Sequence, residues 1–170
     1  MTRPGYATVA LLGLLATAAP AFIRPRARLI WNATSSVPIG LYAIHPAGQL
    51  QIGELVVVSP PHALAEFLAV RHYLPIGLPM LKHVLALSGQ TVCRRGPMIS
   101  VDGRTMGIAL DHDSQGRPLP VWQGCQHIPF DDVFLMNRSS PSSFDGRYFG
   151  LLPRKTIVGR AEPIWAGLEH

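Results

Sequence analysis

The N-terminal part of the chain is one long apolar run. Residues 4–23 carry no charge, and Tyr6–Ile23 is interrupted only by threonine, glycine and Pro20. As a helix this run would be about 27 Å long, enough to cross the hydrocarbon core of a bilayer. The small residues from Ala16 to Ala21 also fit the cleavage region of a secretory signal. Because the run is long and the candidate chemistry follows closely, we favour a retained anchor, whose orientation the flanking charges leave open.

After an arginine-rich linker, short runs of β-forming residues alternate with glycine and proline, which indicates a mainly β domain. The segments predicted as strands are Gly40–His45, Glu54–Ser59, Thr91–Arg95, Ile99–Ala109, Leu119–Trp122, Asp132–Asn137 and Thr156–Trp165.

Two local signals refine this picture. The dipeptide Asp102-Gly103 lies inside the run Ile99–Ala109, and such a pair between apolar stretches is a strong hairpin signal. The hairpin predicts an antiparallel sheet. Pro60 and Pro61 precede His62–His72, whose apolar spacing predicts one short helix outside the sheet.

Composition and charge narrow the class of protein. The 170 residues are 48% hydrophobic and 15% charged, which suits one globular domain with an added apolar segment. Most of the net charge of +5 comes from the N-terminal segment, since four arginines precede residue 30 and no Asp or Glu precedes Glu54. A basic flank beside an apolar run is typical of contact with anionic lipid, so we expect no nucleic-acid partner.

The two cysteines, Cys93 and Cys125, leave two possibilities open. They lack the spacing and the paired histidines of a zinc site, so we expect neither a metal nor another cofactor. In an oxidising compartment they could form one disulfide. They could equally be two unlinked small core residues.

The first candidate for chemistry is Ser36, about a dozen residues past the apolar run. Pro38 restricts its own backbone and Gly40 permits unusual angles, so a serine just before them can be held exposed on a turn. Taken alone, the segment could equally be a polar turn that leads into a strand.

The second candidate is Lys82, a lone cation in the apolar run Pro79–Gly89. Burial in an apolar wall disfavours the ammonium form, and a neutral amine can deprotonate a serine hydroxyl. The alternative is a lysine on an edge strand whose amine reaches out to water.

These two segments, in this order after an apolar N-terminus, resemble type I signal peptidases, and more closely their conjugative-transfer branch, the TraF-type peptidases. The stretch Asn32–Tyr42 matches that branch's Asn-x-Thr/Ser-x-Ser-x-Pro-x-Gly-Leu-Tyr pattern. Gly53–Val58 and Leu81–Val92 resemble two further family blocks, and Asn137–Gly150 resembles the C-terminal one. The resemblance covers nearly the whole chain.

The resemblance implies the signal-peptidase β fold and roles for single residues. Ser36 would be the nucleophile and Lys82 its general base. Thr34 would help to stabilise the oxyanion, and Ser143 and Asp145 would orient the lysine or brace the site. Arg147 would brace Asp145. The histidines, including His83, would take no part.

Some positions depart from the family pattern. The family usually has one more residue between the nucleophile and the proline, so counting back from Pro38 would select Ser35 instead of Ser36. The TraF-type spacing favours Ser36. Gln90 replaces an acidic residue and Gly146 replaces a serine, which affects the supporting roles more than the proposed dyad.

The expectation is therefore an N-terminal anchor or signal over residues 1–29 and a periplasmic serine peptidase domain over residues 30–170. It would sit on the inner membrane, or be periplasmic after signal cleavage, and would process exported precursors. The TraF-type resemblance implies a conjugative pilin precursor, with hydrolysis or cyclisation both chemically possible. The alternatives are a non-catalytic component of a secretion apparatus and a self-cleaving repressor-type Ser/Lys protease.

Overall fold

The computed structural model describes residues 5, 8–15 and 29–167. Helix covers residues 5 and 8–15, and residues 1–4, 6–7 and 16–28 of the predicted anchor lie outside the described residues. Within these described ranges, no helix combines the length and the apolar character that a membrane crossing requires.

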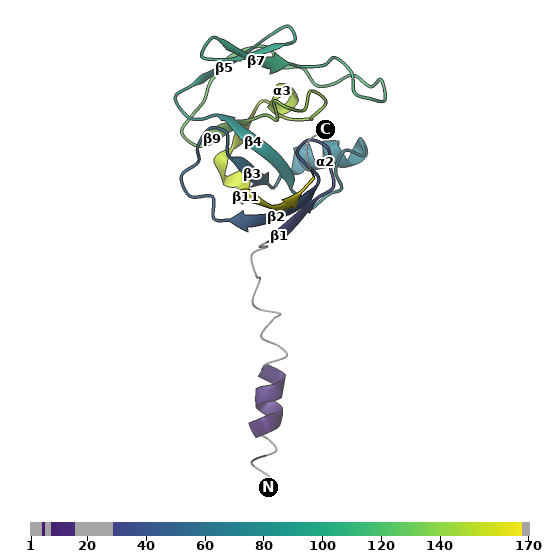
Figure 1. Ribbon diagram of the computed structural model, residues 1–170, viewed down its shortest axis with the longest axis vertical. Helices are drawn as coiled ribbons and strands as arrows, with labels where there is room; N and C mark the ends of the chain where they lie inside the picture. Colours follow the sequence, from purple (N-terminus) through teal and green to yellow (C-terminus); the bar gives the residue numbers. More distant parts are fainter. Residues whose placement is uncertain (1–4, 6–7, 16–28, 168–170) are drawn as a thin grey trace.

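The domain from residue 29 onward is built from antiparallel strands (Figure 1). The strands are β1 Leu29–Asn32, β2 Gly40–His45, β3 Leu55–Val58, β4 Met80–Ala86, β5 Thr91–Arg95, β6 Met98–Val101, β7 Arg104–Ile108, β8 Gly124–His127, β9 Asp132–Leu135, β10 Leu151–Pro153 and β11 Ile157–Ala166. The helical elements of the domain are α2 His62–Val70, α3 Gly146–Phe149 and the 3-10 turn η1 Arg154–Thr156.

The strands form two sheets. A seven-stranded sheet has the order β1-β2-β11-β3-β4-β9-β10, and a four-stranded sheet has the order β7-β6-β5-β8. Figure 1 shows the smaller sheet at one end of the domain and β1 and β2 at the other. This arrangement confirms the predicted mainly β, antiparallel fold.

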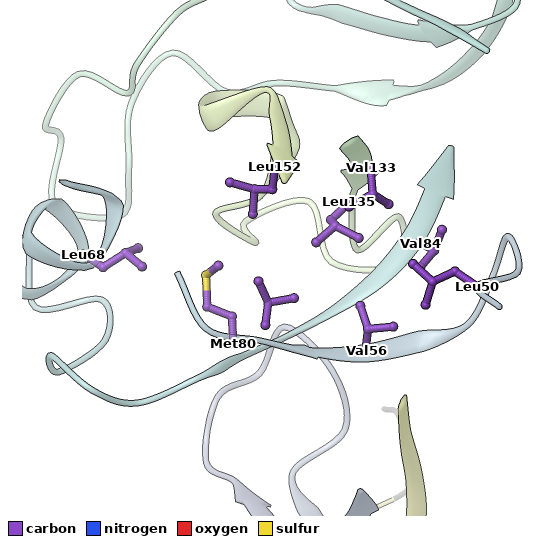
Figure 2. Packing of buried hydrophobic residues seen from close by; sticks show 9 residues of the cluster. Leu50, Val56, Leu68, Met80, Val84, Val133, Leu135 and Leu152 are labelled. Atoms are coloured by element: carbon purple, nitrogen blue, oxygen red, sulfur yellow. The ribbon is translucent and has the colours of Figure 1, made fainter. Parts of the chain in front are cut away.

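The apolar core follows the inner faces of these strands. Figure 2 shows one cluster, in which Val56 from β3 and Val84 from β4 face Val133 and Leu135 from β9, and Leu68 of α2 closes one side. A second cluster lies under the four-stranded sheet, around Ile99 and Phe134.

The predicted hairpin and disulfide can both be located. Asp102 and Gly103 both have positive φ and join β6 to β7, as the dipeptide predicted. Cys93 on β5 lies directly opposite Cys125 on β8, and the two form a disulfide. The disulfide therefore joins two neighbouring strands of the smaller sheet.

The prediction of a strand at Leu119–Trp122 was wrong. Pro118 and Pro120 cannot donate to a sheet ladder, and the amide of Leu119 instead bonds Asp111 O within a loop. The strand in this region is β8, which begins at Gly124 and is mostly exposed and polar. Backbone hydrogen bonds and the disulfide therefore hold β8 beside β5. Its sequence has no alternation of apolar and polar residues from which the strand could be predicted.

Candidate active site

The loop between β1 and β2 carries the candidate nucleophile. Asn32, buried at the end of β1, donates its amide hydrogens to the carbonyls of Thr34, Val37 and Pro38. Its Oδ1 accepts from both the N–H and the hydroxyl of Thr34. One buried amide thus shapes the whole loop.

Within this loop the hydroxyl groups of Thr34 and Ser36 lie 3.2 Å apart. Ser36 is half-buried, whereas Ser35 is exposed. Val37, next in sequence, is buried and fixes the loop to the domain. The loop therefore presents Ser36 at the surface of the domain while its flanks are held in place.

Gly40, the first residue of β2, lies very close to the backbone of β11. A Cβ at this position would lie 2.1 Å from Trp165 O and 2.6 Å from Ala166 Cα on β11. Only glycine permits this close approach of two backbones. The glycine lets β2 pair with the end of β11 immediately after the Ser36 loop.

Lys82 lies on an interior strand of the seven-stranded sheet. It is on β4, paired with Val56 of β3, and only 4% of its surface is exposed. The alternative of an edge-strand lysine that reaches water is therefore wrong. Burial lowers the Lys82 pKa to about 8; nearby Asp145 opposes this shift and Arg147 adds to it. A substantial fraction of the amine is neutral near pH 8.

The Lys82 amine is held by Ser143. Its Nζ donates to Ser143 Oγ over 2.7 Å, and no hydrogen bond joins Lys82 to Ser36 among the described residues. One N–H of the amine is thereby directed, which leaves the lone pair of the neutral form free for another partner.

Asp145 and Arg147 lie behind this lysine and are almost fully buried. Arg147 contacts both carboxylate oxygens of Asp145, at 2.9 and 2.8 Å, and its guanidinium also donates to the carbonyls of Ser140 and Ser143. Asp145 also caps α3 by accepting from the N–H of Arg147. The pair therefore holds the loop that carries Ser143.

Steric crowding explains why glycine occupies position 146, where the family pattern has a serine. A Cβ there would lie 2.6 Å from Leu135 O and 2.7 Å from the ring of Phe134. The large Phe134 beneath α3 therefore leaves no room for the serine that the family pattern has at this position.

A cleft of about 440 Å³ joins the candidate residues. Ser36, Thr34, Lys82 and Ser143 all line it, whereas Asp145 is buried behind it. Ser35 lines it as well. The fold thus brings four of the five predicted site residues to one cavity, from segments more than one hundred residues apart in sequence.

The far wall of the cleft was not predicted from the sequence. Tyr73, just after α2, donates its hydroxyl to Asp113 in the loop that follows β7. Arg117 also donates to Asp113, over 2.7 Å, and to Arg71 O. These contacts join α2 to residues 109–120. This contact joins segments forty residues apart in sequence, and no local sequence pattern predicts it.

This wall is mostly apolar beyond the bridge. Leu68, Leu74, Leu110, Leu119 and Phe144 line the same cavity as the Ser36 loop. The cleft can therefore take both the polar backbone and apolar side chains of a peptide. In the described part of the chain, no group of three or more His, Cys, Asp or Glu residues could hold a metal.

The chain resembles known proteins. The sequence model of a family described as "Signal peptidase, peptidase S26" matches residues 1–166. No curated protein matches the chain. A solved structure of a signal peptidase I from Enterococcus faecalis V583 is similar with a TM-score of 0.41 and 17% identity, covering 67% of this chain and 97% of that one.

Proposed function

Because this chain belongs to the signal peptidase family, peptidase S26, we propose that it cleaves exported precursor proteins with Ser36 as nucleophile and Lys82 as general base. The family makes the chain a serine peptidase. The observation that carries the choice of residues is the buried amine of Lys82, with a pKa of about 8, in the same cleft as Ser36.

The reaction begins with proton transfer from Ser36 Oγ to the neutral amine of Lys82. The Ser36 oxygen then attacks the scissile carbonyl, and negative charge develops on the carbonyl oxygen. The Thr34 hydroxyl oxygen lies 3.2 Å from Ser36 Oγ, and this hydroxyl would donate to the oxyanion together with the N–H of Ser36 once its hydrogen turns away from Asn32 Oδ1. Lys82 ammonium returns the proton to the leaving amine, and an ester to Ser36 remains.

A second nucleophile resolves this ester. Water gives hydrolysis, with Lys82 again accepting a proton. An amine of the same substrate would instead give a ring, and an amine of another molecule would give a transpeptidation product, because aminolysis of an ester needs the same base and the same oxyanion donors.

We propose that the substrate binds as an extended strand beside the Ser36 loop, where backbone hydrogen bonds give affinity and the apolar wall receives its side chains. The stretch Asn32–Tyr42 matches the conjugative-transfer branch, which favours a pilin precursor. We assign residues 1–29 to a membrane anchor or signal and residues 30–170 to a peptidase domain outside the cytoplasm. These assignments place the cleft where exported precursors present their cleavage regions.

The test is co-expression with a candidate exported pilin precursor, followed by mass measurement of the products. The parent enzyme should yield the processed mass, and Ser36→Ala and Lys82→Met should each leave only the precursor. A cyclic product would be lighter than the linear one by one water. Loss of processing in Ser35→Ala but not in Ser36→Ala would show that the nucleophile is Ser35. Unchanged processing in Lys82→Met would refute the dyad and favour a non-catalytic role.

A further inference from the structure

The side chain of Asn137 continues the sheet at the point where β9 ends. The ladder between β9 and β4 closes with Met136 N donating to His83 O. One residue further on, Asn137 Nδ2 donates to Leu81 O over 3.2 Å and Asn137 Oδ1 accepts from His83 N over 3.0 Å. A carboxamide has the same donor and acceptor as a peptide bond, so it substitutes here for a strand partner.

Leu81 and His83 are the two neighbours of Lys82, so this amide holds β4 on both sides of the lysine. Asn137 is fully buried. Its Nδ2 is also 3.4 Å from Ser143 Oγ, the oxygen that accepts from Lys82 Nζ. The one side chain therefore contacts the strand that carries the lysine and the hydroxyl that orients its amine.

The orientation of this amide is determined by its partners. Turned over, the amide would direct Nδ2 at the N–H of His83 and Oδ1 at the carbonyl of Leu81, so that donor would face donor and acceptor would face acceptor. The Oδ1 atom also lies 3.0 Å from His83 Nδ1. Because a carbonyl oxygen only accepts, His83 Nδ1 carries a hydrogen. His83 was expected to take no part, yet its ring contacts this amide.

We propose that Asn137 is a positioning residue for the amine of Lys82, an inference that rests on the role proposed for that lysine. A lysine side chain has four rotatable bonds, and among the described residues Ser143 supplies the one hydrogen bond that fixes this amine. Asn137 holds both ends of that contact: the backbone from which the lysine extends and the hydroxyl at its tip. The charged groups that act on the amine are Asp145 and Arg147.

Two substitutions remove the hydrogen bonds of the Asn137 side chain to different extents. Asn137→Asp keeps the shape and the acceptor for His83 N–H but, when ionised, offers no hydrogen to Leu81 O or Ser143. The adjacent Arg147, whose guanidinium is 3.4 Å from Asn137 O, favours the ionised form, whereas the carboxylate of Asp145, which accepts from Asn137 N over 3.0 Å, opposes it. Asn137→Leu removes donor and acceptor together. Thr156→Val is the control, because it deletes a side-chain bond to Pro153 O away from the cleft.

The chain permits a direct observation of the amine. Lys82 and the exposed Lys155 are its only lysines, so the full-length enzyme labelled with ¹³C at the lysine ε-carbons gives two signals that titrate with pH. Lys155→Arg assigns them. In the parent, Lys82 should titrate with a midpoint of about 8. This measurement does not require activity.

In folded Asn137→Asp the Lys82 midpoint should rise by about one unit, because the new carboxylate favours the ammonium and the amine is less firmly buried. The kcat, measured above both midpoints, should fall by roughly ten-fold or more at an unchanged KM. Asn137→Leu should also raise the Lys82 midpoint and lower kcat. Thr156→Val should change neither the midpoint nor kcat.

A Lys82 midpoint and a kcat that match the parent in a folded Asn137→Asp enzyme would overturn the proposal, whether or not Asn137→Leu folds. A failure of the proposed function looks different. It would show as cleavage that survives Lys82→Met, whatever the variants at Asn137 do.

Discussion

At the residue scale, Lys82 works against the stability of the fold. Burial lowers its pKa from 10.5 to about 8, so between these two pH values the folded chain binds fewer protons than the unfolded chain. The free energy of unfolding therefore rises with pH across this window. Below pH 8 both states carry the charge, and the full cost remains, at about 3 kcal/mol for the shift.

Replacing Lys82 by methionine should remove this cost. The variant fills a similar volume without a charge, so at pH 7 its free energy of unfolding should exceed that of the parent by up to about 3 kcal/mol. The difference should shrink as the pH rises through the window from 8 to 10.5. Urea unfolding at pH 7 and at pH 10, with exposed Lys155→Met as the control, measures both effects.

A Lys82→Met chain that is less stable than the parent at pH 7 would contradict this account. Such a result would mean that the ammonium is well solvated or firmly paired in the folded chain. Greater stability together with lost activity would instead be the signature of a residue that is kept for chemistry at the expense of stability.

At the scale of elements, the bridge between α2 and residues 109–120 sets the far wall of the cleft. Asp113 is its centre, since its carboxylate accepts from Tyr73 and Arg117 and its side chain is only 7% exposed. Although burial by itself raises the pKa of Asp113, the hydrogen bonds from Tyr73 and Arg117 lower it overall. The bridge is therefore charged, and intact, throughout the neutral range.

Asp113→Asn should loosen this wall without touching Ser36 or Lys82. The amide cannot accept charge-assisted bonds from Tyr73 and Arg117 at once, so we expect KM for a peptide substrate to rise several-fold while kcat changes little. Steady-state kinetics measures the two constants. The matched control is Asp111→Asn, an exposed carboxylate in the same loop. A fall in kcat at constant KM would instead place Asp113 in the chemistry.

The sequence predicted most elements because their apolar residues alternate. The predicted Gly40–His45 and Thr91–Arg95 coincide with β2 and β5, and the predicted helix contains α2. The exposed polar strand β8 was missed because ladder bonds and a disulfide hold it in place of apolar packing. An alternating pattern therefore identifies strands that bury one face. It misses β8, which distant partners hold in place, and β4, which is buried on both faces and so shows no alternation.

In the candidate site too, some residues could be recognised from the local sequence and others only from the fold. Ser36 and Lys82 stand out in sequence because a serine before Pro-x-Gly and a cation in an apolar run are locally unusual. Asp113 does not stand out, and Asn137 is marked only by its place in a family block, because the contacts that matter come from partners 40 and 54 residues away. Local chemistry was readable, whereas the contacts that support it required the fold.

At the scale of the whole molecule, the disulfide-linked sheet and the candidate nucleophile loop lie at opposite ends of the domain. The disulfide and the β6–β7 hairpin lie in the four-stranded sheet at one end of the domain (Figure 1). The Ser36 loop follows β1 at the other end, directly after the arginine-rich linker, and β4 brings Lys82 to the same cleft. A peptidase tethered through residues 1–29 would hold this cleft close to the bilayer, where exported precursors emerge.

The most direct test of the Ser36–Lys82 pair is the rate at which a peptidyl active ester acylates the enzyme as a function of pH, with the modified residue identified by mass spectrometry. The account predicts one acyl group on Ser36, at a rate that rises to a plateau with a midpoint of about pH 8 and that is lost in Lys82→Met. Acylation of Ser35, or an equal rate in Lys82→Met, would contradict it.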